Sequence, residues 1–452
     1  MLCRSLINRL NYRLFAVILF CLGWLSDAVA DNSKYVILIT IDGMHAGMVT
    51  DPEMPSPYLK MMKREGLFVD KVKGVPPTAT YPSHTSIVTG ALPVHHRIFY
   101  NSPFVFNKDS VVSYWYADSI KAPTIWQAAK ESGLTTASLF WPVSTKSRWI
   151  DYNIPEYWSV KRVANQLDFI KPVCTPSGIL DELEQNAVGR LDHLTFGAGS
   201  INRDARTAYM ANYIMNKYHP NLMTIHLITT DYAQHATGMQ SERTRMAVAS
   251  VDHAIGLIVE NLKQTHRMDS TTVIVCGDHG FSDISQAIAP NVWLTRAGLL
   301  SEKPGGDWKA CFHGNGSVMF LYLRDSNDKK TLKKVENIIQ NLPVETRSLF
   351  KVVSQKELTA MGGDPKVALA LEPIAGISVS TNRTGADVLV KKGGSHGYFS
   401  GIDPTCFMVY GCNVPEGKEL QTMRQIDIAP YVMHLLGVDY KFVDGKLPQE
   451  LF

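Results

Sequence analysis

Uninterrupted apolar segments recur along the chain and alternate with segments whose apolar positions follow the helical period. The apolar segments are short and rich in β-branched residues, which is typical of strands buried on both faces of a parallel sheet. We predict strands at residues 34–41, 135–141, 221–229, 271–276 and 405–410, and helices at residues 57–65, 123–132, 206–218, 243–266 and 426–438. This alternation indicates an α/β fold with a central, mostly parallel sheet flanked by helices.

Two long segments depart from the alternation. Residues 142–203 are irregular and carry several neighbouring aromatic side chains, and a long irregular segment within a compact domain is usually a functional loop or lid. Residues 282–392 hold a strand-like run and a helical pattern between Gly- and Pro-rich joins, which predicts an accessory insertion. The length of 452 residues suits one large domain with insertions, or two domains; we predict a single domain over residues 31–452.

Charge narrows the range of partners. The chain has 45 Lys and Arg against 42 Asp and Glu, so its net charge is near +3. This balance provides no strong field toward nucleic acid or a membrane surface. We therefore expect a small-molecule substrate and no binding to nucleic-acid duplexes, and we leave the oligomeric state open.

The first residues have the pattern of a secretory signal peptide. Arg4, Arg9 and Arg13 form a basic region, and the apolar run at residues 14–25 is short for a transmembrane span. Ala28-Val29-Ala30 is a typical cleavage site, so residues 1–30 are predicted to be removed. The mature chain would be secreted or periplasmic with no stable membrane partner, although an uncleaved anchor is the alternative.

An exported chain can form disulfides, so its cysteines matter. Cys3 and Cys21 lie within the predicted signal peptide, and five cysteines remain in the mature chain: Cys174, Cys276, Cys311, Cys406 and Cys412. An odd number leaves at least one thiol free or paired between chains. Cys276 lies in an apolar strand and is expected to be buried and free, whereas Cys406 and Cys412 are close enough in sequence to close a small loop.

Three predicted strands each deliver an aspartate at or just beyond the carboxyl end, where functional residues of open α/β sheets gather. These are Asp42, Asp231 and Asp278. Each alone would be an ordinary turn residue, but histidines accompany two of them and a third lies in a Gly-rich segment: His235, His279 and His396. Three carboxylates and three imidazoles fit two zinc ions, which take mixed oxygen and nitrogen ligands.

Thr80 lies in the polar stretch PTATYPSHTSIVTG, which can form a short helix stopped by Gly90. Pro82 is favoured in the first turn, so Thr80 is predicted at or just before the helix N-terminus. The simplest role for Thr80 is that of an N-cap. Beside bound metal, however, its hydroxyl would become an activated nucleophile.

The order of several short motifs resembles the nucleotide pyrophosphatase/phosphodiesterase family of the alkaline phosphatase superfamily. These motifs span nearly the whole mature chain: ITIDGM, PTATYPSHTSIVTG, HHRIFYN, FWPVS, DYAQH, GDHGF, SHGY and DIAPYVMHLLGV. The resemblance implies an alkaline phosphatase-like fold with two zinc ions. The family often has Thr-Phe-Pro-Asn where this chain has Thr80-Tyr81-Pro82-Ser83, so the chain departs from the family's pattern at Tyr81 and Ser83.

The resemblance also implies the role of each residue. One zinc would be held by Asp231, His235 and His396, and the other by Asp42, Asp278 and His279 together with the nucleophile Thr80. Asn101 would steady a non-bridging phosphate oxygen. Tyr81 would support one face of a nucleobase, and Tyr157 would flank the other.

The resulting hypothesis is a secreted, zinc-dependent phosphodiesterase or nucleotide pyrophosphatase with a phospho-threonine intermediate. The alternatives are a phosphonoacetate hydrolase-like enzyme, with Lys146 and Arg148 holding the carboxylate, and a lipid head-group phosphodiesterase. A phosphomonoesterase is disfavoured because no arginine near Asn101 is evident for the extra phosphate charge. A non-catalytic binding module would not need the seven proposed metal-site positions.

Overall fold

The computed structural model describes residues 33–106, 113–158, 167–314, 316–399 and 401–452. The predicted signal peptide, with Cys3 and Cys21, lies outside these residues. Within the described part of the chain, none of the helices has the length and apolar character needed to span a membrane.

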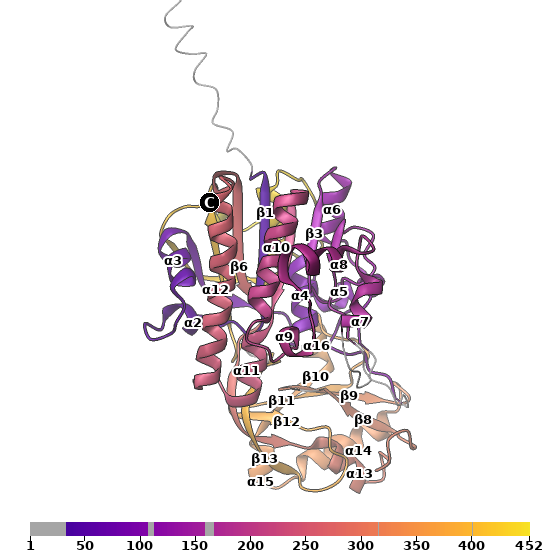
Figure 1. The fold of residues 1–452 in the computed structure, drawn as a ribbon. Coiled ribbons are helices and arrows are strands. Elements are labelled where there is room, and N and C mark those ends of the chain that lie inside the picture. Colours follow the sequence, from indigo (N-terminus) through magenta and orange to yellow (C-terminus); the bar gives the residue numbers. More distant parts are fainter. Residues whose placement is uncertain (1–32, 107–112, 159–166, 315, 400) are drawn as a thin grey trace, which may run out of the picture.

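The larger lobe is built on an eight-stranded sheet with the order β15-β2-β14-β6-β1-β5-β3-β4 (Figure 1). Its neighbouring strands are parallel, except that β14 runs antiparallel to both β6 and β2. The strands are β1 (Tyr35–Ile41), β2 (Leu67–Lys73), β3 (Thr136–Leu139), β4 (Tyr152–Ile154), β5 (Leu222–Leu227), β6 (Thr271–Gly277), β14 (Thr405–Gly411) and β15 (Lys418–Arg424). The predicted α/β class with a mostly parallel central sheet is therefore confirmed.

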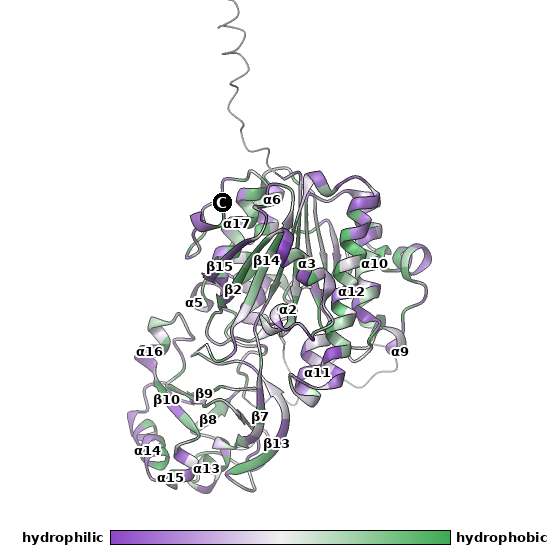
Figure 2. Ribbon diagram, turned by 90° about the vertical axis from the view of Figure 1, so that its left-hand side faces the viewer, coloured by the Kyte–Doolittle hydropathy of each residue, from purple (hydrophilic) through white to green (hydrophobic). Residues whose placement is uncertain are grey.

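Helices pack on both faces of this sheet through two separate hydrophobic clusters. The first face carries α2 (Gly47–Thr50), α3 (Pro57–Glu65), α10 (Arg203–Tyr218) and α12 (Glu242–Gln264), and the second carries α4 (Thr80–Thr89), α6 (Ile125–Glu131) and α17 (Ile428–Leu435). Figure 2 shows hydrophobic residues along the central strands and mixed hydrophobic and hydrophilic residues on the helices. The sheet is thus buried on both sides, as its continuous apolar strands require.

The smaller lobe lies beyond the carboxyl ends of β1 and β6 (Figure 1). It contains a four-stranded sheet, β10-β11-β9-β8, and a three-stranded sheet, β12-β7-β13. Its elements are β7 (Ser282–Ile288), α13 (Pro290–Arg296), β8 (Ala310–His313), β9 (Met319–Leu323), α14 (Lys329–Gln340), α15 (Val344–Arg347), β10 (Phe350–Ser354), α16 (Gln355–Ala360), β11 (Leu369–Pro373), β12 (Ile377–Val379) and β13 (Val388–Ser395). Strand β13 leads directly to His396, so this lobe returns the chain to the larger one.

The irregular segment 142–203 also contributes regular structure. It adds β4 at the edge of the large sheet and several short helices, α7 (Leu167–Ile170), α8 (Ile179–Leu183) and α9 (His193–Phe196). The remaining short helices are α5 (Pro93–His96) and α11 (Thr229–Thr237). The strand predicted for 221–229 ends at Leu227, because Thr229 already begins α11.

The five cysteines of the described chain form no disulfide with one another, and Cys276 is fully buried as predicted. The small loop considered for Cys406 and Cys412 does not form. Both residues flank or lie on the extended strand β14, and six residues of strand separate their Cα atoms by about 20 Å. A disulfide needs Cα atoms within about 7 Å.

Candidate active site

Strand pairing brings two of the predicted aspartates together. Ile41 of β1 is in register with Gly277 of β6, so the residues that follow, Asp42 and Asp278, lie side by side. Asp278 Oδ1 accepts the backbone N–H groups of Gly43 (3.1 Å) and His279 (2.9 Å). The turn after β6 is thereby fixed, and it directs His279 toward Asp42.

We call Asp42, Asp278 and His279 the buried group. His279 Nε2 lies 3.3 Å from Asp42 Oδ1 and 3.1 Å from Asp278 Oδ2. The side chains of Asp278 and His279 have no solvent exposure. Thr80 Oγ1 lies 3.3 Å from the same His279 Nε2, so the proposed nucleophile adjoins this group.

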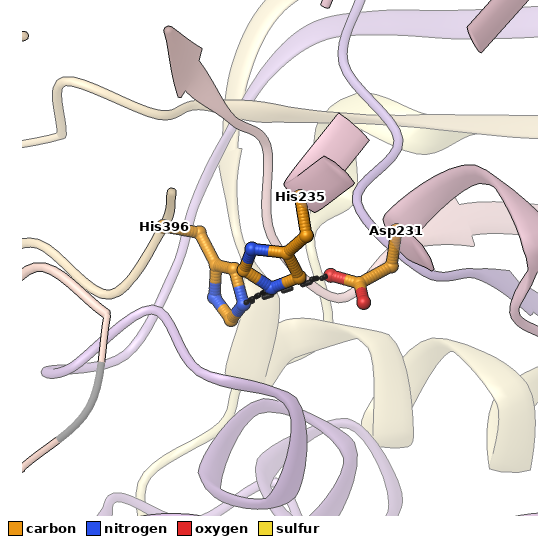
Figure 3. A group of neighbouring side chains, drawn as sticks. All are labelled: Asp231, His235 and His396. Carbon is orange, nitrogen blue, oxygen red and sulfur yellow. Dashed lines mark hydrogen bonds and ion pairs between the residues drawn. The ribbon is translucent and has the colours of Figure 1, made fainter. Parts of the chain in front are cut away.

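We call Asp231, His235 and His396 the open group (Figure 3). Asp231 and His235 lie one turn apart on α11 rather than at a strand end, and His396 comes from the segment after β13. His235 Nε2 lies 3.3 Å from Asp231 Oδ1 and 3.2 Å from His396 Nε2. The side chain of His235 is 41% exposed, so solvent reaches this group.

All three imidazoles are oriented in the same way. Their Nδ1 atoms face backbone carbonyls, which are those of Gly394 for His235, Gly280 for His279 and Thr78 for His396, at 3.0–3.1 Å. A carbonyl can only accept, so Nδ1 carries the proton and Nε2 keeps its lone pair toward the site. This tautomer is the one that binds metal through Nε2.

The three aspartates also have oxygen atoms available to bind a cation. Each aspartate keeps one buried oxygen that accepts no hydrogen bond from the described residues: Asp42 Oδ1, Asp231 Oδ1 and Asp278 Oδ2. Buried carboxylate oxygens are rarely left this way, because the missing partner costs about 1–3 kcal/mol. Ligand atoms of Asp231, His235 and His396, and of Asp42, Asp231 and His279, lie within 4.8 Å of one another. The donor set therefore fits divalent metal ions.

The two groups differ in electrostatics. Burial and the charge of Asp231 raise the pKa of Asp42, and burial and the charge of Asp42 raise that of Asp278. Burial lowers the pKa of His279 to about 3, so this imidazole stays neutral. In the open group, burial disfavours the charged forms of Asp231 and His235. Their pairing outweighs this effect, so the pKa of Asp231 is lowered and that of His235 is raised.

Thr80 is not the N-cap of α4. The helix begins at Thr80, and the N-cap position is held by Ala79, which has no capping side chain. Gly90 ends the helix in the left-handed conformation, as predicted. The threonine hydroxyl is therefore directed to His279 rather than to the backbone of its own helix, and the simple capping role does not apply.

Asn101 is held at the start of the same helix. The backbone N–H of Tyr81 donates to Asn101 Oδ1 over 2.9 Å. Because the carbonyl end of the amide is occupied, its NH2 group is the end that can donate to a ligand. Thr80 and Asn101 both line a cavity of about 230 Å³ that also reaches Asp42 and Asp231.

The two predicted aromatic residues have different positions. Tyr81 lines this cavity, but it is 6% exposed, and its hydroxyl donates to Glu156 over 2.9 Å. Tyr157 does not line the cavity; it packs edge-to-face on Trp115. The neighbouring Trp158 lines the cavity in its place.

The basic residues considered for a carboxylate, Lys146 and Arg148, are exposed and lie over Tyr116 and Trp149. Neither lines the cavity. Arg203 does line it, contrary to the expectation that no arginine lies near Asn101.

Sequence reasoning also missed Glu156 and His226, which line the cavity together with Arg203. His226 Nε2 lies 3.1 Å from Asp42 Oδ2 and orients that carboxylate. A histidine within an apolar strand one residue before its end was a usable signal for it. Glu156 and Arg203 lie in or at the end of the irregular segment, where no periodic pattern distinguishes them.

Comparison with known proteins agrees with this geometry. Residues 36–399 match the family model described as type I phosphodiesterase/nucleotide pyrophosphatase. Mouse ectonucleotide pyrophosphatase/phosphodiesterase family member 3 is 25% identical over 281 residues, covering 58% of this chain and 28% of that protein. Human family member 1 is 24% identical over 426 residues, covering 89% of this chain and 40% of that protein.

A bis(5′-adenosyl)-triphosphatase of Pongo abelii is 25% identical over 279 residues, which cover 61% of this chain and 54% of that protein. The chain thus spans about a quarter to a half of the length of the curated relatives that it matches.

Solved structures share the fold. Murine ectonucleotide pyrophosphatase/phosphodiesterase 5 superposes with a TM-score of 0.66 at 18% identity, over 92% of this chain and 100% of that chain. An inactive threonine-to-alanine variant of the same murine protein, solved in complex with AMP, gives a TM-score of 0.64 at 17% identity over 91% of this chain and 97% of that chain. With the family model covering most of its length, the chain belongs to the type I phosphodiesterase/nucleotide pyrophosphatase family.

Proposed function

We propose that this chain is a secreted phosphodiesterase of small molecules that holds two zinc ions and forms a phospho-threonine intermediate at Thr80. The observation that carries the proposal is the position of Thr80. Its hydroxyl is free of helix capping and lies 3.3 Å from His279 Nε2, in a cavity that Asp42 and Asp231 also line with their unpartnered carboxylate oxygens.

The residues divide the chemistry among them. The open group would hold one zinc ion and the buried group the other, and zinc bound there would act as a Lewis acid that lowers the pKa of a hydroxyl and stabilises charge on phosphate oxygens. Thr80 Oγ1 forms the new bond to phosphorus as the ester or anhydride oxygen leaves. Water then hydrolyses the phospho-threonine. The Asn101 amide donates to a non-bridging oxygen, whose charge grows in the transition state.

Diesters and anhydrides of nucleotides are the substrate class that we propose. The relatives support it, because one is named a bis(5′-adenosyl)-triphosphatase and the murine structural neighbour was solved with AMP. Asn101 would supply a neutral donor to the reacting phosphate, which carries a single negative charge in a diester.

Turnover by zinc-loaded protein tests the proposal. We expect hydrolysis of bis-p-nitrophenyl phosphate and of diadenosine triphosphate, loss of both activities on chelation, and recovery with zinc. Thr80→Ala should abolish turnover while metal analysis still finds two zinc ions, because the six other ligands remain.

Thr89→Ala provides the matched control. Thr89 is buried in the same helix, and its hydroxyl only bonds the Thr85 carbonyl (2.7 Å). Its loss should leave kcat close to the wild-type value. Turnover by Thr80→Ala at the level of Thr89→Ala would rule out Thr80 as the nucleophile.

A further inference from the structure

Arg203 stands apart from the other cavity residues because it is a buried cation without a counter-ion. It is 1% exposed, and it is the only Lys or Arg among the described residues that line the cavity of about 230 Å³. Among the described residues, no carboxylate lies within ion-pair distance of its guanidinium. Glu156 lines the same cavity, but it accepts from the Tyr81 hydroxyl.

The guanidinium is held firmly but is not saturated. Nη1 donates to the Phe196 carbonyl over 2.9 Å, and the central carbon of the guanidinium lies 4.5–5.1 Å from the centroids of three rings: Phe140, Trp158 and Phe196. Buried Nη2 has no hydrogen-bond partner among the described residues. An unpaired buried charge is costly, and a stacked guanidinium retains its fork of donors for an anion.

The neighbouring residue Asp204 links Arg203 to the proposed metal ligands. The Asp204 carboxylate accepts the backbone N–H groups of Ile228 (3.1 Å) and Thr229 (3.2 Å) at the start of α11. That helix carries the open-group ligand Asp231. The same contact therefore ties the start of α10, where Arg203 lies, to the proposed metal ligands.

We propose that Arg203 is a specificity-determining residue that binds a second anionic group of the substrate, beyond the reacting phosphate. This inference rests on the proposed function, because it assigns a second contact with the substrate in the same cavity. Thr80 and Asn101, which would act on the reacting phosphate, line this cavity, and Arg203 adds a positive charge to the same lining. The group recognised is a phosphate or a carboxylate, as in a phosphoanhydride or a phosphonate that bears a carboxylate.

The size of the cavity supports a short substrate arm. Its volume of about 230 Å³ lies below the roughly 300–1,000 Å³ that is usual for ligand pockets. A second phosphate or a carboxylate a few bonds from phosphorus fits such a space. Charge-assisted hydrogen bonds to its oxygens would complete the donors of Arg203.

Calorimetric binding to zinc-loaded protein tests the inference with inorganic phosphate, pyrophosphate and phosphonoacetate as probes. For Arg203→Met, we expect the ratio of the pyrophosphate Kd to the phosphate Kd to rise about 10- to 100-fold, which is the effect of one charged hydrogen-bonded contact. Arg203→Lys keeps the charge but loses the fork, so its ratio should fall between those of the wild type and Arg203→Met.

Arg206→Met is the matched control. Arg206 lies one turn further along α10, and its Nη1 donates to the Val188 carbonyl (2.7 Å) outside the cavity. The ratio of the pyrophosphate Kd to the phosphate Kd in Arg206→Met should therefore equal that of the wild type. A rise for pyrophosphate alone identifies a phosphate as the second group, and a rise for phosphonoacetate alone identifies a carboxylate. Either supports the inference, as does a rise for both.

An unchanged ratio in Arg203→Met for both probes would overturn the inference. The ratio would also stay unchanged if Arg203 bound the reacting phosphate itself, because the Kd values of phosphate and pyrophosphate would then rise together. Both Kd values come from one preparation of the variant, so their ratio does not depend on the fraction of the protein that is folded. Hydrolysis of bis-p-nitrophenyl phosphate by the wild type is scored separately, so failure of the proposed function and failure of this inference give different results.

Discussion

The buried group and the open group contain similar side chains but balance their charge in opposite ways. In the open group, Asp231 and His235 form an acid–base pair in which the pKa of each is shifted toward its charged form. In the buried group, burial raises the pKa values of Asp42 and Asp278, the charges of neighbouring carboxylates raise them further, and His279 stays neutral. The open group can therefore compensate its own charge, whereas the buried group requires an added cation.

The difference follows from where the ligands arise in the chain. Asp42 and Asp278 follow adjacent strands in the centre of the sheet, where no solvent reaches Asp278. Asp231 and His235 lie on α11 at the boundary of the two lobes, and His396 follows the last strand of the smaller lobe. Rigid strands build the buried group, and a helix and a returning segment build the open group.

The largest effect that we expect is on stability when metal is removed. With metal at about a thousandfold excess over its Kd, each bound ion adds about 4 kcal/mol to the free energy of unfolding, and chelation removes it. The loss of stability on chelation should grow with pH.

In metal-free protein, the raised pKa values of Asp42 and Asp278 mean that the folded state binds more protons than the unfolded state.

Stability of the metal-free protein should consequently fall as pH rises from about 4, the unfolded pKa of an aspartate, through the raised folded values. Urea unfolding at pH 5 and pH 8, with chelator and with zinc, measures this. The zinc-loaded protein should show a smaller decline. Parallel pH dependences with and without zinc would show that the buried group does not hold the metal.

The next effect separates the two groups by turnover. Asp278→Asn should lower kcat by about 10²–10³-fold, a loss comparable to that of an electrostatic catalytic contact, and added zinc should not restore it. His235→Asn should respond differently, because its exposed position lets water replace the lost ligand. Turnover of bis-p-nitrophenyl phosphate and zinc content, measured at rising zinc, should show rescue for His235→Asn alone.

A smaller effect is expected from the residue that orients Asp42. His226 bonds Asp42 Oδ2 (3.1 Å) and the Phe140 carbonyl (3.2 Å), so His226→Asn should weaken zinc binding by about 10- to 100-fold. His253→Asn on the exposed side of α12 is the control. Competition with a zinc chelator gives both affinities, and equal values would remove the positioning role of His226.

The sequence predicted much of the fold because local patterns and tertiary structure agree in the large sheet. Apolar runs became β1 and β6, the helix predicted at residues 57–65 has those bounds, and Gly90 ends α4 as expected. The aspartates that follow those strands were placed correctly at one edge, since parallel register brings strand ends together.

The remaining features depend on contacts between distant segments. Nothing in the sequence near Arg203 indicates that its guanidinium lies over the rings of Phe140 and Trp158. The bond between Tyr81 and Glu156 joins residues 75 positions apart, so the environment of the Tyr81 ring did not follow from the motif. Side chains in the irregular segment have no periodicity from which to infer their direction.

The last effects concern stability rather than metal binding and come from two hydroxyls, one beside each group, that donate to carboxylates. Tyr81 donates to Glu156 beside the buried group, and Thr78 donates to Asp403 (2.7 Å) behind the open group. Tyr81→Phe should cost about 1 kcal/mol of stability, because the Glu156 side chain retains some contact with water.

Thr78→Val should cost more, about 2–3 kcal/mol, because it leaves buried partners unsatisfied. Asp403 is 1% exposed, and the Thr78 hydroxyl also accepts the backbone N–H of Tyr398.

The Thr78→Val penalty should also depend on pH. Burial raises the pKa of Asp403 to about 7, and the hydrogen bond from the Thr78 hydroxyl limits this rise. Its loss raises that pKa further, and a raised folded pKa costs stability as pH rises through it. The Thr78→Val penalty in urea unfolding should therefore be larger at pH 8 than at pH 5, while that of Tyr81→Phe stays near 1 kcal/mol at both. Equal penalties at both pH values for Thr78→Val would show that Asp403 is not ionised behind the open group.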